Sequence, residues 1–243
     1  MSTPLARPSA LRPAASTAKP GRLTDAARRH WLLVVALIWG LFVGSPWLAP
    51  VLMRIGWTGA GQAIYTAYSF TCHQLPERSY FLFGPKVMYS LEEIQAAWQN
   101  TNNPLILRRF IGNEAMGWKV AWSDRMVSLY TSMLVGIVIF AVFRKRLPRQ
   151  PIWALVLLLA PMAIDGGSHA LSDVLGGGIG LGFRDSNAWL AALTGSTFPA
   201  TSYAGDALGS FNWLMRLSTG ILMGLAIVWL LLPMIDATAA ETQ

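Results

Sequence analysis

The sequence contains few charged residues and almost no cysteine. Only 13% of its 243 residues are Asp, Glu, Lys or Arg, whereas soluble domains usually carry about 25%. Cys72 is the single cysteine, so the chain forms neither an intrachain disulfide nor a four-thiolate zinc or iron–sulfur site. The motifs G-x-x-x-x-G-K-[ST], G-x-G-x-x-G, H-E-x-x-H and G-x-S-x-G are also absent. These absences argue against a soluble enzyme of a common class.

The sequence contains several long apolar segments. Hydrophobic residues account for 53% of the chain, and its mean hydropathy is +0.42. A helix needs about 20 mostly apolar residues to cross a bilayer; four segments approach or exceed this, namely 31–53, 126–143, 151–175 and 217–235. The third qualifies only if Asp165 and His169 lie near its end. We therefore expect an all-α, polytopic membrane helix bundle of about four spans, with residues 30–236 as a single membrane domain.

Basic residues flank these spans on one side. One cluster precedes the first span (Arg7, Arg12, Lys19, Arg22, Arg28 and Arg29), and another joins the second span to the third (Arg144, Lys145, Arg146 and Arg149). Because basic flanking residues stay in the cytoplasm, both termini are predicted to be cytoplasmic. Residues 1–29 would form a disordered basic tail and residues 237–243 a short C-terminal tail. No basic stretch alternates with stacking aromatic residues, so no nucleic-acid partner is expected.

Two long loops would then face the outside of the cell. In the first, residues 56–71 are moderately apolar, and the sequence leaves open whether they span the membrane, re-enter it or lie on it. Ser90 and Glu93 form the pattern of a capping box, which predicts a short surface helix over residues 90–100. The second loop, Gly176 to Phe211, is rich in Gly, Ser and Thr, and we expect a lid or binding loop there.

A polar helix face follows the third apolar run. Asp165, His169 and Asp173 are spaced by four residues, which places them within an arc of about 80° on one helix face. A charge at the centre of a bilayer costs ~2.5–3.5 kcal/mol, so an ionised Asp165 needs a partner, for which Arg125 and Arg216 are the candidates. The face has either a chemical role or a buried pairing with these arginines.

Most other concentrated polar motifs fall on the same predicted side. Taken singly, charges at the ends of spans can snorkel to the interface, and pairs in loops can be solvated. If they converge, they form a binding site between facing helices. The predicted binding residues are Cys72, His73, Gln74, Arg78, Arg125, Arg184, Asp185, Asn187 and Arg216.

The histidines and carboxylates also allow a metal site. Imidazole and carboxylate groups suit zinc or manganese, although their spacing here matches no established metal motif. A divalent transition metal would activate water for a hydrolase-like reaction, with Glu77, Asp124 or Asp165 as the candidate catalytic group. The candidate metal ligands are His73, Asp165, His169 and Asp173.

The run from Thr71 to Phe81 resembles an uncharacterised prokaryotic membrane family, the domain of unknown function 2085. The family signature is Cys-His-Gln followed by Arg-Ser and an aromatic residue. The resemblance continues in short motifs at 124–130, 161–166, 184–187 and 216–220, and it implies a multi-pass protein of a prokaryotic plasma membrane without assigning an activity. Family members commonly carry a second cysteine where this chain has Ser123, so a thiol-pair site or a disulfide to Cys72 is not expected here.

Three functional interpretations remain open. The site binds a small polar solute, an ion or a lipid headgroup; it belongs to a metal-dependent membrane-embedded enzyme; or the chain is an accessory subunit of a larger membrane complex. Transport is disfavoured because the inner halves of the spans carry no ionisable residue. The pattern Gly220-Ile-Leu-Met-Gly224 predicts close helix packing in the last span.

Overall fold

The computed structural model describes residues 30–144, 146 and 151–241. Four of its helices are long and apolar enough to cross a membrane: α2 (Trp31–Arg54), α6 (Asp124–Phe143), α7 (Ile152–Gly176) and α11 (Phe211–Glu241). Each coincides with one of the predicted spans, so the polytopic helix bundle is confirmed. The predicted tail 1–29 and part of the second basic cluster lie outside the described residues.

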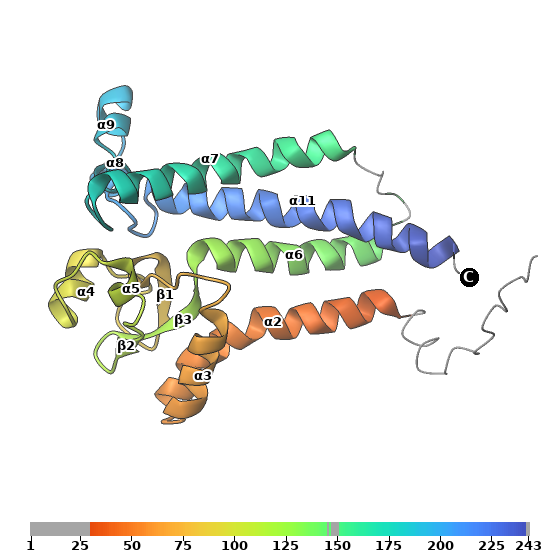
Figure 1. The fold of residues 1–243 in the computed structure, drawn as a ribbon, viewed down its shortest axis with the longest axis horizontal. Coiled ribbons are helices and arrows are strands. Elements are labelled where there is room, and N and C mark those ends of the chain that lie inside the picture. Colours follow the sequence, from red (N-terminus) through yellow and green to blue (C-terminus); the bar gives the residue numbers. More distant parts are fainter. Residues whose placement is uncertain (1–29, 145, 147–150, 242–243) are drawn as a thin grey trace, which may run out of the picture.

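The four long helices lie side by side in the order α2, α6, α11, α7 (Figure 1). Helices that follow one another along the chain run in opposite directions. The start of α2, the α6–α7 connection and the end of α11 therefore lie at one end of the bundle. Residues 55–123 and 177–210 lie at the other end, which we call the loop end.

Small residues bring α6 and α11 close together. A Cβ atom added at Gly220 would lie 2.1 Å from Ser128 Oγ, and one added at Gly224 would lie 2.0 Å from Ser132 Oγ. No side chain larger than hydrogen fits at either position while the helices keep this spacing. The close packing predicted from the Gly-x-x-x-Gly pattern is confirmed.

The first loop is a small folded unit with an antiparallel sheet. The central strand β3 (Gly117–Ser123) pairs with β1 (Ser79–Leu82) on one side and with β2 (Gly112–Asn113) on the other, and it leads directly into α6. No strand was predicted from the sequence. Six of the seven residues of β3 are buried, so the strand lacks the alternation of polar and apolar residues that marks a half-exposed strand.

Short helices complete this unit. They are η1 (Pro76–Arg78), α4 (Leu91–Ala97) and α5 (Pro104–Leu107). At the start of α4, Ser90 Oγ accepts from the Glu93 N–H at 3.3 Å, and Glu93 Oε2 accepts from the Ser90 N–H at 3.0 Å. The predicted capping box is confirmed. The core of this unit is made of Leu75, Phe81, Tyr89, Ile94, Leu107, Phe110 and Met116, together with Ile179 of the second loop.

Helix α3 (Thr58–Tyr68) lies within the segment whose placement the sequence left open. It has 11 residues, or about 16 Å of helix, which is too short to cross a hydrocarbon core of about 30 Å. Figure 1 shows it turned away from the axis of α2 at the loop end. Residues 56–71 therefore do not form a fifth span.

The second loop contains three short helices, α8 (Phe183–Ser186), α9 (Ala188–Thr194) and α10 (Ala200–Tyr203). It returns the chain from the end of α7 to the start of α11. Helix α11 continues to Glu241, into the segment that the sequence analysis assigned to a short tail.

Candidate functional site

The buried face of α7 is polar. Its buried residues are Asp165, His169 and Ser172, whereas apolar side chains such as Ile164 and Leu175 are 72% and 71% exposed. This is the arrangement expected when lipid surrounds the helix and polar groups turn toward protein partners. The predicted polar face of α7 is thus directed into the bundle.

Arg184 reaches this face from the second loop. Its Nη2 lies 2.7 Å from Asp165 Oδ1 and 3.1 Å from His169 Nε2. Because a guanidinium only donates, His169 Nε2 is the acceptor in this contact. On the other side, Arg125 Nη2 of α6 donates to Asp165 Oδ2 at 2.8 Å. Asp165 therefore joins two arginines, Arg125 as predicted and Arg184 in place of Arg216.

The backbone of the second loop places Arg184 against α7. The Arg184 N–H donates to Ser172 Oγ at 2.9 Å, and Arg184 Nε donates to Asn212 Oδ1 at 3.1 Å. Gly182 permits this approach, since a Cβ atom there would lie 2.1 Å from Ser172 Oγ. Arg184, in the short helix α8, is thereby held against α7.

A second group of ion pairs adjoins the first. Arg216 of α11 donates from Nε to both carboxylate oxygens of Asp124 at 2.9 Å, and its Nη1 contacts Asp206 Oδ1. Arg78 Nε donates to the other oxygen of Asp206 at 2.6 Å, and Arg78 Nη2 lies 3.5 Å from Asp173. Burial raises the pKa of Asp206, but Arg78 and Arg216 outweigh it and hold this pKa below its usual range.

Charge is balanced across these two groups, which we call the ion-pair network. Its members are Arg78, Arg125, Arg184, Arg216, Asp124, Asp165, Asp173 and Asp206. Each arginine has an aspartate partner, so the network ties α6, α7, α11 and both loops together. Removing one partner of a buried ion pair typically costs about 3–5 kcal/mol, because the other charge is left unpaired.

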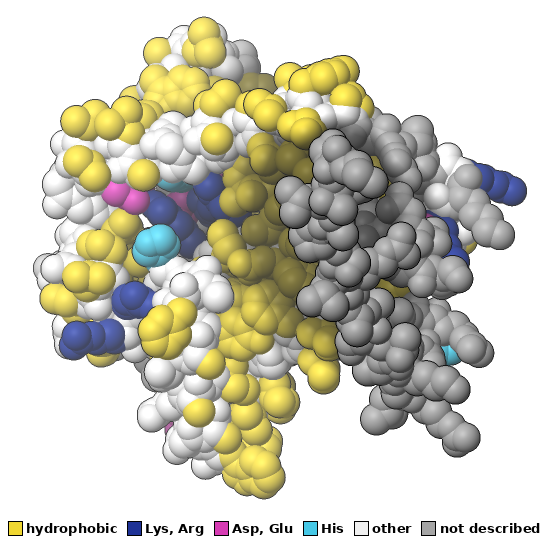
Figure 2. Space-filling view, turned by 45° about the vertical axis from the view of Figure 1, so that its right-hand side comes forward, with side chains coloured by type: hydrophobic (Ala, Val, Ile, Leu, Met, Phe, Trp, Pro, Cys, Tyr) yellow, Lys and Arg dark blue, Asp and Glu magenta, His cyan; other side chains and the backbone are white. Residues whose placement is uncertain are grey.

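The space-filling view shows charged and histidine side chains gathered in a recess on one face, beside a broad band of hydrophobic side chains (Figure 2). Arg78 and Arg125 each keep 12% of their side-chain surface exposed, more than Arg184 or Arg216. The network is therefore largely covered, with limited access from solvent.

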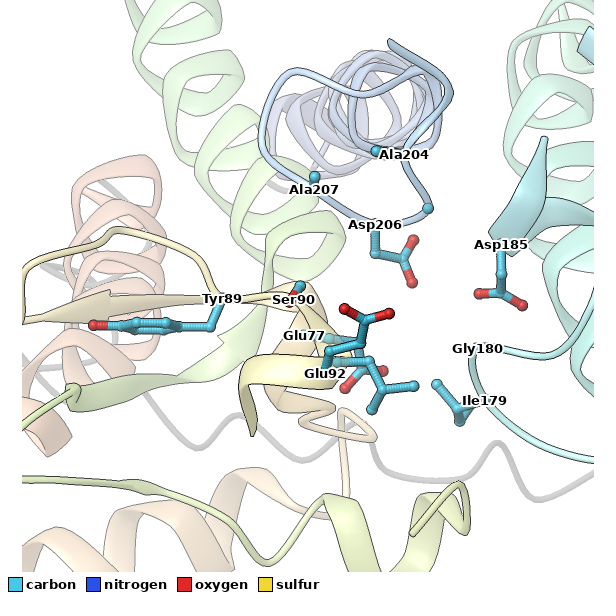
Figure 3. Close-up of a pocket in the computed structure, with 12 residues that line it drawn as sticks. Glu77, Tyr89, Ser90, Glu92, Ile179, Gly180, Asp185, Ala204, Asp206 and Ala207 are labelled. Atoms are coloured by element: carbon cyan, nitrogen blue, oxygen red, sulfur yellow. The ribbon is translucent and has the colours of Figure 1, made fainter. Parts of the chain in front are cut away.

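A pocket of about 340 Å³ lies beside the network at the loop end. Both loops contribute to its walls, which include Glu77, Tyr89, Glu92, Asp185 and Asp206 (Figure 3). Asp206 belongs to the pocket and to the network at once. The lining joins segments from the first and second loops, as expected for a ligand site between elements.

Glu77 is the least satisfied polar side chain of this pocket. It is 2% exposed, and neither of its carboxylate oxygens has a hydrogen-bond partner among the described residues. The nearest cation is Arg78, whose Nε lies 3.9 Å from Glu77 Oε1. Burial raises the pKa of Glu77 to about 7, against the opposing charge of Arg78.

The first three predicted binding residues lie apart from the network. Cys72 Sγ accepts from the N–H groups of Gln74 and Ser123, each at 3.3 Å, and Gln74 Nε2 donates to the Tyr65 carbonyl at 2.8 Å. His73 is exposed. Within the first loop, Cys72 and Gln74 thus attach the segment before η1 to β3 and α3.

Asp185 and Asn187 were also predicted to bind a ligand, and they too lie outside the ion-pair network. Asp185 lines the pocket and caps α8, its Oδ2 accepting from the Gly182 N–H at 2.9 Å. Asn187 has a φ of 44° at the junction of α8 and α9, and its Nδ2 donates to the Tyr203 carbonyl at 3.3 Å. Asn is among the few residues that adopt this conformation readily, so Asn187 shapes the second loop.

The predicted metal site is not formed by the side chains proposed for it. Within residues 30–144, 146 and 151–241, no group of three or more His, Cys, Asp or Glu side chains is arranged to hold a metal ion. Asp165 is engaged by two arginines, and Asp173 faces Arg78. Among the catalytic candidates, Asp124 and Asp165 are likewise paired, which leaves Glu77 with free oxygens.

Two important residues were absent from the sequence predictions. Asp206 bridges Arg78 and Arg216, and no sequence motif pointed to it. Lys119 is fully buried in β3, where its Nζ donates to the carbonyls of Gln74 at 2.6 Å and Arg108 at 2.9 Å. Burial lowers the pKa of Lys119 to about 7. A lysine inside an apolar run was the available signal.

Comparison with known proteins supports the family resemblance. An uncharacterized protein of Methanocaldococcus jannaschii is 27% identical over 147 residues, covering 57% of this chain and 72% of that protein. No solved structure matches the chain. Residues 114–203, which include α6, α7 and Arg184, match the family described as predicted membrane protein (DUF2085). The Cys-His-Gln motif lies before this range. The resemblance to this family that the sequence motifs indicated is therefore supported over residues 114–203.

Proposed function

We propose that the protein binds a small polar ligand in the loop-end pocket, and that this end faces the outside of the cell. The observation that carries the proposal is Glu77, whose two carboxylate oxygens are buried at the pocket without a hydrogen bond. Leaving a buried polar group unsatisfied costs about 1–3 kcal/mol, and more for a charged group. A ligand that bonds to Glu77 would recover this cost.

The surroundings of the pocket support binding by a preformed site. Arg78 and Asp206 join the first loop to the second with a 2.6 Å ion pair. The same Asp206 is held by Arg216 of α11, so the walls of the pocket are fixed to the membrane helices. A site that is ordered before its ligand arrives loses less entropy on binding.

Binding is favoured over permeation or catalysis. Residues 31–53, 126–143, 152–164 and 217–235 contain no Asp, Glu, Lys, Arg or His, so the spans offer no charged path between the two ends of the bundle. The carboxylates of the ion-pair network are neutralised by arginines. No specific contact of the described residues favours an accessory-subunit role.

The test is to fill the pocket. Ala207 lines it, and Ala207→Trp would occupy the space whatever the chemistry of the ligand. Ala192→Trp, on the exposed surface of α9, is the matched control. The full chain in detergent is screened by thermal unfolding against cationic, neutral and anionic small solutes, and in nanodiscs against lipids of differing headgroup.

We expect at least one class of compound to stabilise the protein and the control variant, and Ala207→Trp to lose the effect. A ligand at 100 times its Kd stabilises by about 2.7 kcal/mol. If no solute or lipid stabilises the protein, or if Ala207→Trp responds as the control does, the proposal is wrong.

A further inference from the structure

The pocket is lined by acidic side chains. Of the twelve described residues around it, four are acidic and none is Lys, Arg or His. Figure 3 shows carboxylate groups from both loops gathered around one space. The four are Glu77, Glu92, Asp185 and Asp206. Asp206 is held by two arginines of the ion-pair network, whereas the other three carboxylates lie outside that network.

The polar groups of the lining mainly accept hydrogen bonds. Tyr89 Oη donates to the Met116 carbonyl at 2.9 Å, so its hydrogen is already used. Asp185 engages one oxygen with the Gly182 N–H, and Glu77 engages neither. An ionised carboxylate accepts only. The complementary ligand must therefore supply hydrogen-bond donors, and positive charge would match the excess of carboxylates.

The spacing of these acids does not suit a bare metal ion. Calcium and magnesium ligands lie at about 2.0–2.6 Å from the ion, which demands closely clustered oxygens. The described residues contain no such group, and the cavity measures about 340 Å³. The carboxylates instead surround a space large enough for an organic molecule.

We propose, resting on the function proposed above, that the ligand carries a primary ammonium or guanidinium group that bonds to Glu77 and is flanked by Glu92 and Asp185. Such a group offers several N–H donors and a positive charge, the features that the lining lacks. The same chemistry occurs in free amines and in the ethanolamine headgroup of lipids. Both sources reach a pocket at the end of a membrane bundle.

Electrostatics at Glu77 agree with this assignment. Its pKa of about 7 reflects burial without a donor, and the neighbouring Asp206 adds to the rise while Arg78 opposes it. Burial also raises the pKa of Asp185. A bound cation would stabilise the ionised form of both groups.

The test for a free ligand compares two compounds of equal chain length. Putrescine carries two primary ammonium groups, and 1,4-butanediol carries two hydroxyls in their place. Calorimetric titration of the full chain in detergent should detect putrescine binding and weaker or no binding of butanediol. Glu77→Gln and Glu92→Gln should each weaken putrescine binding about tenfold or more. Glu114→Gln, in the exposed turn between β2 and β3, removes an equal charge away from the pocket and should leave binding unchanged.

The test for a lipid ligand uses nanodiscs. Phosphatidylethanolamine and phosphatidylcholine have the same net charge, but only the former has N–H donors. Greater thermal stability in phosphatidylethanolamine, lost in Glu77→Gln, would identify the headgroup as the source. The inference is overturned if neither amine source binds better than its control. If neutral or anionic solutes then stabilise the protein and Ala207→Trp abolishes this, pocket binding survives and only the cation assignment fails. If nothing binds, both are wrong.

Discussion

At the scale of single residues, the pKa of a buried acid depends on whether arginines lie against its carboxylate. Asp165 has an arginine on each carboxylate oxygen, and Asp206 lies between Arg78 and Arg216. Glu77 is equally buried but has no hydrogen-bond donor. The pKa values follow this difference, since that of Asp206 is lowered and that of Glu77 is raised to about 7.

Glu77 should make stability depend on pH. With a folded pKa of about 7 and an ordinary value of 4.5, the folded state keeps a proton that the unfolded chain loses between these values. Its contribution is present below pH 4.5 and is lost as the pH rises to 7, an upper limit of about 3 kcal/mol. Glu77→Gln should therefore raise the unfolding temperature of the ligand-free protein more at pH 8 than at pH 5.

The charged neighbours of Glu77 are Arg78, Asp206 and Lys119. Lys119 has a lowered pKa, so its own contribution grows as the pH rises from 7 toward 10.5. Lys119 is present in both proteins, so to first order its contribution to stability cancels when the variant is compared with wild type. A difference in unfolding temperature that is the same at pH 5 and pH 8 would contradict a Glu77 that is buried without a hydrogen bond.

At the scale of elements, the second loop depends on its close contact with α7. Gly182→Ala would place a Cβ atom 2.1 Å from Ser172 Oγ and 2.3 Å from the Ser172 carbonyl oxygen. The loop must shift, which weakens the Arg184 contacts with Ser172 and Asp165. Overpacking of this kind costs about 1–3 kcal/mol. Thermal unfolding and proteolysis of the loop should both report the loss.

Gly167→Ala, in α7, is the matched control. No atom lies within 4 Å of a Cβ at this position, and Ala favours a helix over Gly by about 0.5–1 kcal/mol in soluble hosts. We expect the control to unfold at or above the wild-type temperature. If both variants unfold alike, the loop does not rely on the contact between Gly182 and Ser172.

At the scale of the whole molecule, the orientation of the bundle can be tested through its single thiol. Ser123 Oγ lies 3.4 Å from Cys72 Sγ, so Ser123→Cys brings two thiols within reach of a disulfide. If the loop end is outside the cell, the variant should be oxidised in cells with an oxidising exterior. Alkylation with a mass-adding thiol reagent, before and after reduction, measures the fraction oxidised.

Wild type, with Cys72 alone, is the control for reagent access, because this thiol is buried. Isolated membranes treated with an oxidant show whether the pair can bond at all. A variant that oxidises in those membranes but remains reduced in cells would place the loop end in the cytoplasm and overturn the proposed orientation.

Sequence patterns predicted the features that depend on residues close together in the chain. The four spans follow from apolar length, the start of α4 from Ser90 and Glu93, and the contact of α6 with α11 from Gly220 and Gly224. Strand β3 was missed because it is buried on both faces. The metal site predicted at His73, Asp165, His169 and Asp173 is not seen among the described residues, where arginines from other segments engage the two aspartates.

Hydropathy and local spacing are enough to predict four membrane spans in this chain and to identify the polar face of α7. These properties depend on hydropathy and spacing along a few turns. The folded structure is needed to show which charges pair, that Asp206 joins Arg78 to Arg216, and that Glu77 lies beside a pocket without a hydrogen bond. The protonation state of a buried carboxylate depends on the charges and hydrogen-bond donors that folding brings within about 4 Å of it. In this protein those groups come from distant parts of the chain.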